Sequence, residues 1–221
     1  QVSTVNLDSP PATRHPPLLW LEGRCLAFAM TASYALFVDA LRRYLSEEPT
    51  DSGPGLAARL VALLQRLISR GDLTAAQAEE MGPLLGRLLS LHFGTAWDER
   101  LQNVNPAQVR SQTFLAVETL LVALARQQAV LLVCEDLHWA DDLTLTLLAR
   151  LIERLSRLPL LLVCVYRPEE AQAGEPLAAL AVQQAAAYTT QIALRELSTV
   201  QSSQLLMTLL DGAELSPPTH D

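Results

Sequence analysis

The sequence contains no lysine, and all 16 of its lysine-plus-arginine positions are arginine. A phosphate-binding loop of the G-x-x-x-x-G-K-[ST] type needs its lysine to reach the terminal phosphates of a nucleotide. These 221 residues therefore contain no such loop. Arginine in place of lysine throughout a chain also fits a GC-rich genome, so this bias alone assigns no function.

The chain also lacks positive net charge. Its formal net charge is −8, and its arginines are spread thinly along the sequence. Proteins that bind nucleic acid neutralise phosphates with clustered positive charge. We therefore expect no direct contact between this segment and DNA or RNA.

Long apolar runs are missing as well. No uncharged apolar stretch reaches the roughly 20 residues that span a bilayer, and the first residues lack the charged-then-apolar plan of a signal peptide. Cys25, Cys134 and Cys164 are far apart, and the last two lie within apolar runs. This pattern predicts buried thiols in a reducing compartment and no metal site. We expect a cytoplasmic protein without a membrane segment.

Apolar runs alternate with stretches of helical periodicity along the chain. The apolar runs predict strands at 18–25, 129–134, 160–166 and 191–194. The periodicity predicts helices over 34–45, 56–69, 74–92, 106–128, 142–158, 176–187 and 198–210. The second and third runs are apolar throughout, as in strands buried on both faces of a parallel sheet. The fold class is therefore α/β, with helices on both faces of a parallel sheet.

Single residues sharpen these boundaries. Gly23 marks the point where the first strand leaves the sheet, and Gly71 suits a helix C-terminus. Thr74 and Ser198 are candidate N-caps. Pro83 interrupts or restarts the helical segment that begins near Thr74.

The strongest chemical signal is the sequence VLLVCEDLHWADD at residues 130–142. Its apolar strand delivers Glu135 and Asp136 side by side, and ligands of open α/β sheets bind beyond the carboxyl ends of the strands. One carboxylate can hold Mg²⁺ while its neighbour orients a water molecule that attacks a γ-phosphate. An acidic pair at a strand end can also be a solvated turn.

The run EDLHWADD, with LPLLLVCVYRPEE after it, resembles the Walker B and sensor 1 region of the signal-transduction ATPases with numerous domains, the STAND class. More narrowly, it resembles the AAA-type P-loop modules of bacterial multidomain regulators that carry adenylate or guanylate cyclase domains or LuxR-type domains. Residues 20–45 are similar to the second strand and following helix of these modules. Residues 191–198 are similar to the junction with their helical lid.

The resemblance implies a module that binds and hydrolyses ATP with Mg²⁺. Glu135 then occupies the Mg²⁺-coordinating position and Asp136 the position that polarises water, although aspartate is usual at the first of these. Arg167, at the end of the next strand, matches the sensor 1 position, where a guanidinium reads the γ-phosphate. The alternative role of Arg167 is that of a surface arginine ahead of a proline turn.

Other residues around the pair keep more than one interpretation. His138 and Trp139 either link nucleotide state to a partner or are structural, with Trp139 packed under the loop and His138 in a local hydrogen bond. Asp141 and Asp142 precede a helix and are expected to act as N-caps. Arg24 either forms a salt bridge in the core or lies near the site.

The resemblance also implies an incomplete three-layer α/β/α P-loop core with inserted helices. Its parts are an irregular segment at 1–17, a partial core at 18–194 and the truncated start of a helical lid at 195–221. The strand before the phosphate loop, which lies beside the sensor 1 strand in these proteins, is absent. Strand 160–166 is left with an unpaired apolar edge, which favours aggregation. We expect both chain ends to be cut ends and the missing strand and loop to precede Gln1.

Two functions remain open. The first is an ATP-dependent switch in a multidomain signalling or transcriptional regulator. Its partners are ATP, the upstream loop segment, and the downstream lid and effector domains, with self-oligomerisation as a further option. The second is a degenerate scaffold that joins sensor and effector domains without hydrolysis. For these 221 residues alone we expect no measurable hydrolysis and at most weak nucleotide binding.

Overall fold

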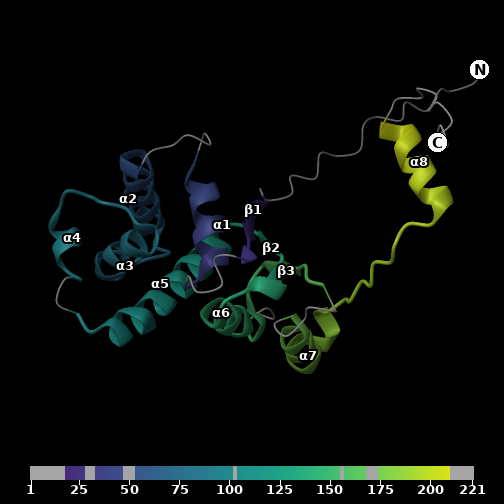
Figure 1. Ribbon diagram of the computed structural model, residues 1–221. Helices are drawn as coiled ribbons and strands as arrows, with labels where there is room; N and C mark the ends of the chain where they lie inside the picture. Colours follow the sequence, from purple (N-terminus) through teal and green to yellow (C-terminus); the bar gives the residue numbers. More distant parts are fainter. Residues whose placement is uncertain are drawn as a thin grey trace, which may run out of the picture. The chain divides into compact units, whose positions relative to one another are not determined.

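The computed structural model describes residues 18–27, 33–46, 53–101, 104–154, 157–167 and 174–209 (Figure 1). The chain divides into two compact units, residues 1–188 and residues 189–221. The irregular segment expected at 1–17 lies outside the described residues.

A parallel sheet of three strands lies in the first unit, in the order β1 (Leu19–Arg24), β2 (Val130–Glu135) and β3 (Leu160–Cys164). Leu21 pairs with Leu132, which in turn pairs with Leu162. Parallel neighbours need crossover connections, and helices supply them here, as Figure 1 shows. The predicted α/β class with a parallel sheet is confirmed for these strands.

All seven predicted helices are present in the described residues, together with a short one that was not predicted, α4. Their bounds are α1 (Ala35–Leu45), α2 (Gly53–Ser69), α3 (Ala75–Leu88), α4 (Ala96–Glu99), α5 (Pro106–Gln127), α6 (Asp142–Ile152), α7 (Gly174–Ala185) and α8 (Thr199–Leu209). Short 3₁₀ turns follow β2 and α7, at η2 (Leu137–Trp139) and η5 (Ala186–Tyr188). The helix α6 ends six residues before the expected position 158.

Capping residues begin two helices as predicted. The Thr74 hydroxyl accepts a hydrogen bond from the Gln77 amide at 3.1 Å, and the Gln77 side chain accepts one from the Thr74 amide at 2.9 Å. Ser198 and Gln201 make the same reciprocal pair, at 3.3 and 2.9 Å. Each capping box satisfies two amides that the helix itself leaves unpaired.

Pro83 does not interrupt α3, which runs through it from Ala75 to Leu88. The prediction of a break was wrong. Residues 81–86 of this helix are all buried. Packing of the whole turn compensates for the hydrogen bond that proline cannot donate.

The predicted strand at 191–194 was also wrong. Residues 189–198 form neither strand nor helix, and the side chains of Ile192 and Leu194 are 77% and 89% exposed. A strand needs a neighbouring backbone to complete its hydrogen bonds. The described residues supply no such neighbour to this segment.

Helices cover one face of the sheet within the described residues. Leu21 and Leu132 point to the covered face and are 1% and 0% exposed, whereas Trp20 and Leu161 point to the other face and are 57% and 59% exposed. Right-handed crossovers that proceed in one direction along a sheet place their helices on the same face. β2 is therefore buried on one face rather than both, and a layer on the second face stays a prediction.

The helix α1 approaches the strand β1 closely at Gly23. A Cβ atom on Gly23 would lie 2.3 Å from the Leu36 carbonyl oxygen and 3.1 Å from the Ala40 Cβ. Gly23 lies inside β1, which extends to Arg24, so it does not mark the point where the strand leaves the sheet. Its missing side chain is what allows the helix to pack against the strand.

We expect Gly23→Ala to lower the free energy of unfolding by about 2 kcal/mol, because the added methyl group must push α1 away from β1. Urea denaturation followed by circular dichroism measures this. Gly53→Ala is the control, because a Cβ atom there has nothing within 4 Å. It is expected to leave stability unchanged or to raise it slightly. Equal effects of the two substitutions would contradict the packing argument.

Candidate functional site

Glu135 and Asp136 lie together at the carboxyl edge of the sheet. Glu135 is the last residue of β2, and Asp136 follows it directly. Their side chains are 30% and 32% exposed. Both carboxylates are therefore accessible from solvent at the edge where ligands of open α/β sheets bind.

The backbone of Asp136 is left-handed, with φ 55° and ψ 40°. Aspartate tolerates this region better than most non-glycine residues. The Trp139 amide donates to the Asp136 carbonyl at 3.0 Å, and the Leu137 amide donates to the Val165 carbonyl at 3.0 Å. These bonds tie η2 to the chain after β3 and hold the Asp136 backbone in place.

The guanidinium of Arg24, at the end of β1, lies on the acidic pair. Arg24 is the register partner of Glu135 in the sheet. Its Nε donates to Glu135 Oε2 at 2.8 Å, its Nη2 contacts the same oxygen, and Nε lies 3.5 Å from Asp136 Oδ2. The hydrogen bond and the charge of Glu135 raise the pKa of Arg24. Of the two roles left open for Arg24, the structure supports a place at the site.

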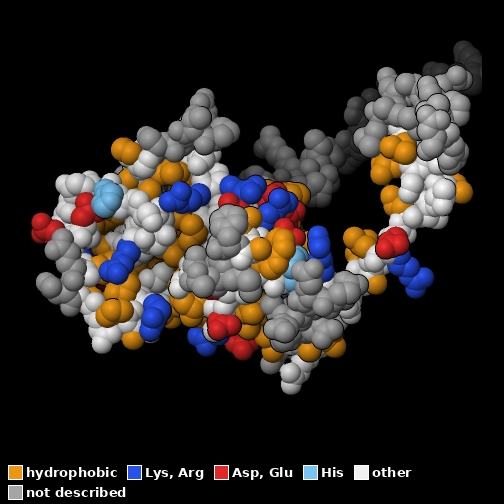
Figure 2. Space-filling view, in the orientation of Figure 1, with side chains coloured by type: hydrophobic (Ala, Val, Ile, Leu, Met, Phe, Trp, Pro, Cys, Tyr) orange, Lys and Arg blue, Asp and Glu red, His pale blue; other side chains and the backbone are white. Residues whose placement is uncertain are grey.

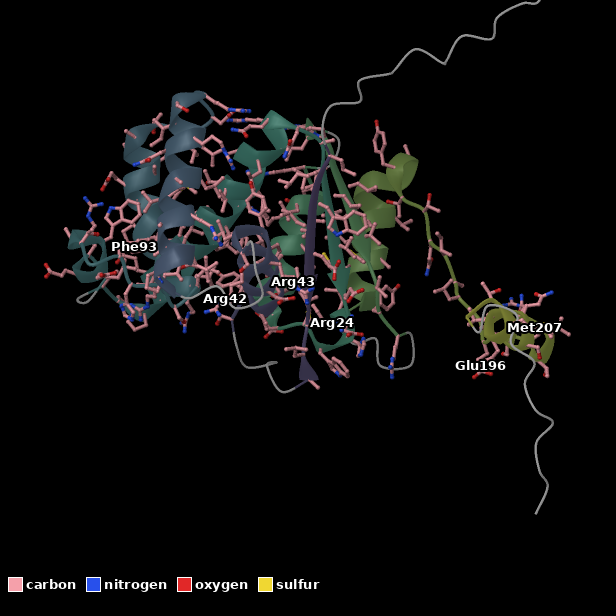
Figure 3. All side chains as sticks on the ribbon, turned by 90° about the horizontal axis from the view of Figure 1, so that it is seen from above. Arg24, Arg42, Arg43, Phe93, Glu196 and Met207 are labelled. Atoms are coloured by element: carbon pink, nitrogen blue, oxygen red, sulfur yellow. The ribbon has the colours of Figure 1, made fainter. Side chains whose placement is uncertain are left out.

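A second group of charges holds the backbone of Arg24. Its amide donates to Asp39 Oδ2 at 2.9 Å, and Arg43 Nε donates to the same oxygen at 3.0 Å. Arg43 Nη1 also donates to Glu22 at 3.3 Å. Figure 3 shows Arg24 and Arg43 close together beside β1 and α1, and basic and acidic side chains lie against one another in Figure 2. Sequence reasoning missed Asp39 and Arg43, although their i, i+4 spacing on a helix was an available signal.

Asp141 ties the starts of two helices together. It is 8% exposed, and its carboxylate accepts bonds from the amides of Leu143 and Thr144, at 3.1 and 3.0 Å, at the start of α6. It also accepts from the Tyr34 and Ala35 amides at the start of α1, at 3.0 and 3.1 Å. The predicted N-cap role of Asp141 is confirmed for α6, but its bonds to α1 were not predicted. The same prediction was wrong for Asp142, which is the first residue of the helix itself.

The rest of the loop after the acidic pair is packed inward. His138 is 6% exposed, and its ring centroid lies 4.4 Å from that of Trp139. Trp139 itself packs against the hydrophobic core. This agrees with the structural role predicted for Trp139, while a link to a partner stays a prediction.

Arg167 lies beyond β3, which ends at Cys164, and its side chain is exposed. A test of the sensor role needs a bound nucleotide, so the sensor role of Arg167 stays a prediction.

The three cysteines are free thiols on and beside the covered face of the sheet. Cys25 and Cys134 are buried, and Cys164 is half-buried. Burial raises the pKa of Cys25 to about 12. A hydrogen bond with Cys164, together with burial, raises the pKa of Cys134. Cys25 and Cys134 are therefore poor nucleophiles and poor metal ligands. The same hydrogen bond lowers the pKa of Cys164.

The acidic pair offers only part of a metal coordination shell. No group of three or more His, Cys, Asp or Glu side chains suited to a metal ion occurs in the described ranges. Mg²⁺ at nucleotide sites is held by one or two carboxylates, with water and phosphate oxygens completing the shell. The carboxylates of Glu135 and Asp136 fit this donor set. The guanidinium of Arg24 already stands beside them as a cation.

A large groove lies elsewhere, in the helical group between β1 and β2. It has a volume of about 860 Å³ between α2, α3 and α4, and its lining is mostly apolar. Its one carboxylate, that of Glu79, pairs with Arg100 at 3.2 Å. The acidic pair is the better candidate for phosphate chemistry because it lies at the carboxyl edge of the sheet.

A family model described as an AAA ATPase domain matches residues 7–163. The match covers more than half of the chain and includes β1, β2 and the acidic pair. The chain belongs to the AAA ATPase domain family. This AAA ATPase domain has no match among curated proteins or solved structures. Arg167 lies beyond the matched part of the domain.

Proteins of the AAA ATPase family generally bind ATP and Mg²⁺. The family match thus agrees with a nucleotide-binding module and with the oxygen donors of the acidic pair. None of the helices in the described ranges has the length and apolar character required to cross a bilayer.

The energetic cost of the left-handed backbone at Asp136 can be measured separately from the effect of the Asp136 charge. We expect Asp136→Ala to lower the free energy of unfolding by about 1 kcal/mol more than Asp136→Asn, because asparagine tolerates this region and alanine does not. Both substitutions remove the same charge beside Arg24, so their difference reports on the backbone. Equal stabilities in urea denaturation would argue against strain at this position.

We expect Asp141→Asn to lower the free energy of unfolding by about 3 kcal/mol, because a buried carboxylate that accepts several bonds is replaced by a neutral amide with one acceptor. Asp142→Asn is the matched control. Asp142 is exposed in the first turn of α6, and its replacement should cost about 0.5 kcal/mol. Thermal and urea denaturation measure both. Similar losses for the two variants would contradict the role of Asp141 in joining α1 to α6.

Proposed function

We propose that this AAA ATPase domain is the ATP- and Mg²⁺-binding core of a regulatory switch in a multidomain signalling or transcriptional regulator of the STAND class. The observation that carries the proposal is the pair Glu135 and Asp136 at the carboxyl end of the middle strand of a parallel sheet, within the matched family domain. The resemblance of EDLHWADD to a Walker B segment supports metal-binding and water-orienting roles for this pair.

In this proposal Glu135 would hold Mg²⁺, and Asp136 would orient the attacking water. Bound Mg²⁺ supplies positive charge that polarises phosphoryl oxygens and stabilises the charge that develops during transfer. Glu135 continues the direction of β2, whereas Asp136 turns out of the strand in its left-handed conformation. Both carboxylates end beside the same guanidinium, 2.8 and 3.5 Å from Arg24 Nε, so one cation and its bound water could contact both of them.

Arg167 would contact the γ-phosphate in the sensor 1 role. Support comes from its position after β3, the strand next to β2, and from its exposed side chain. An exposed guanidinium at the carboxyl edge can reach a ligand there without a change in the sheet.

A phosphate loop must come from outside residues 1–221, because these contain no lysine. We propose that an upstream strand and loop add to the free edge of β3, which pairs only with β2 among the described strands. The partial core would then span residues 18–194, and residues 195–221 would begin a helical lid. The apolar side chains of β3 favour such an added neighbour over water.

ATP and Mg²⁺ would hold the core and lid together, and hydrolysis would release them and change the state of the attached domains. The second candidate is a scaffold that joins sensor and effector domains without hydrolysis. The lack of lysine supports this alternative if no loop is supplied from elsewhere.

The two acidic residues are tested in a longer protein that contains the phosphate loop. We expect Asp136→Asn to lower the rate of ATP hydrolysis about a hundredfold or more and to trap bound ATP, because water loses its orienting carboxylate. Glu135→Gln should abolish the Mg²⁺ dependence of binding. Phosphate release and nucleotide retention on a filter measure these effects.

Glu79→Gln is the control, because it removes a carboxylate that lines the distant groove and pairs with Arg100. It should leave both readouts unchanged. Equal and negligible effects of the Asp136 and Glu135 substitutions would instead support the scaffold. The 221-residue chain alone should show no hydrolysis, and micromolar ATP affinity in calorimetry would contradict the need for an external loop.

A further inference from the structure

Arg24 is held in place at its backbone and contacts the acidic pair with its side chain. Its amide is bound to Asp39, and the next amide, that of Cys25, donates to the Glu135 carbonyl at 3.0 Å. Its side chain is 48% exposed, and the guanidinium ends on Glu135 Oε2. The side chain can therefore leave the carboxylate without any change in β1.

Two donors of Arg24 occupy one oxygen of Glu135. Both Nε and Nη2 point at Oε2, and Nε also lies within 3.5 Å of Asp136 Oδ2. A divalent cation binds carboxylate oxygens through the same lone pairs that these N–H groups use. A metal ion and the guanidinium cannot both use Oε2 fully, and their positive charges repel each other at this range.

We propose that Arg24 is an internal counter-cation that competes with Mg²⁺ for Glu135 and Asp136 and leaves Glu135 Oε2 when the metal takes that oxygen. The inference rests on the proposed function only in taking these two carboxylates as the metal ligands. Arg24 then offsets one of the two negative charges of the metal-free pair and sets how tightly the site binds its cation.

Without Arg24, the negative charges of Glu135 and Asp136 would lie next to each other with less positive charge nearby to offset them. Adjacent like charges repel each other, and an opposite charge nearby offsets this repulsion. Arg43 cannot replace Arg24, because its donors are engaged with Asp39 and Glu22. The two arginines therefore differ in role, although both contact Asp39. The Arg24 side chain contacts the acidic pair, whereas the Arg43 side chain contacts Asp39 and Glu22.

The test measures Mn²⁺ binding to the whole 221-residue chain by electron paramagnetic resonance of the free ion. We expect Arg24→Gln to bind Mn²⁺ about tenfold more tightly than the unmodified chain, because one competing positive charge is removed. Arg43→Gln is the matched control. It removes the same charge from the same neighbourhood but leaves Glu135 and Asp136 with Arg24, so its gain should stay within about twofold, as expected for screened charges.

A second readout is the midpoint of thermal unfolding with and without Mn²⁺. Arg24→Gln should unfold at a lower temperature than the unmodified chain when metal is absent, and Mn²⁺ should raise its midpoint more than that of the unmodified chain. Arg24→Lys keeps the charge without the planar fork and should give an intermediate Mn²⁺ affinity. This variant serves as the test if Arg24→Gln does not fold.

The outcomes separate this inference from the proposed metal site. If Arg24→Gln and the unmodified chain bind Mn²⁺ equally, and Glu135→Gln weakens both, the metal site stands and the competition is overturned. An equal gain in Arg43→Gln overturns it as well, because general electrostatics would then explain the effect. If no variant binds Mn²⁺ in a way that depends on Glu135, the inference and the proposed metal site fail together.

Discussion

The buried carboxylate of Asp141 is the interaction on which the arrangement of this AAA ATPase domain depends. Its oxygens accept bonds from the first amides of both α1 and α6. These helices follow β1 and β2, the strands that carry Arg24 and Glu135 at their ends. One side chain therefore holds the starts of α1 and α6 next to each other. The ends of β1 and β2, which precede these helices, are held close together as a result. The left-handed backbone of Tyr34, φ 61°, is held by the same carboxylate.

The site follows from this frame through sheet register. Arg24 pairs with Glu135 because β1 and β2 run parallel with Leu19 opposite Val130, so their last residues meet at the same edge. Side chains at paired positions of adjacent strands point the same way, and opposite charges there attract each other. Two adjacent carboxylates at a strand end are tolerated in the absence of metal because a guanidinium lies directly across from them.

Periodicity and capping chemistry predicted most elements, because they act over a few residues. The helices after Thr74 and Ser198 begin where the sequence placed them, and the acidic pair ends a strand as expected. Features that depend on distant neighbours were missed. Gly23 looked like a strand end because its partner, the Leu36 carbonyl, belongs to another element. The segment 191–194 has a strand-like pattern but no described backbone beside it. Arg24 could be assigned to the site only once the register was known.

The contacts of Arg24 also show which parts of the candidate site are fixed by the fold and which can move. The backbone of the acidic pair is fixed by η2, by β3 and by the strand itself, none of which needs a nucleotide. The Arg24 side chain, in contrast, is half-exposed and rotatable. If Arg24 competes with the cation as proposed, the carboxylates would be in place before ligand binds, because only the Arg24 side chain, on its anchored backbone, would need to move. Under this proposal, sheet formation and cation binding would be separate steps, and a change at the Arg24 side chain would alter the second without altering the first.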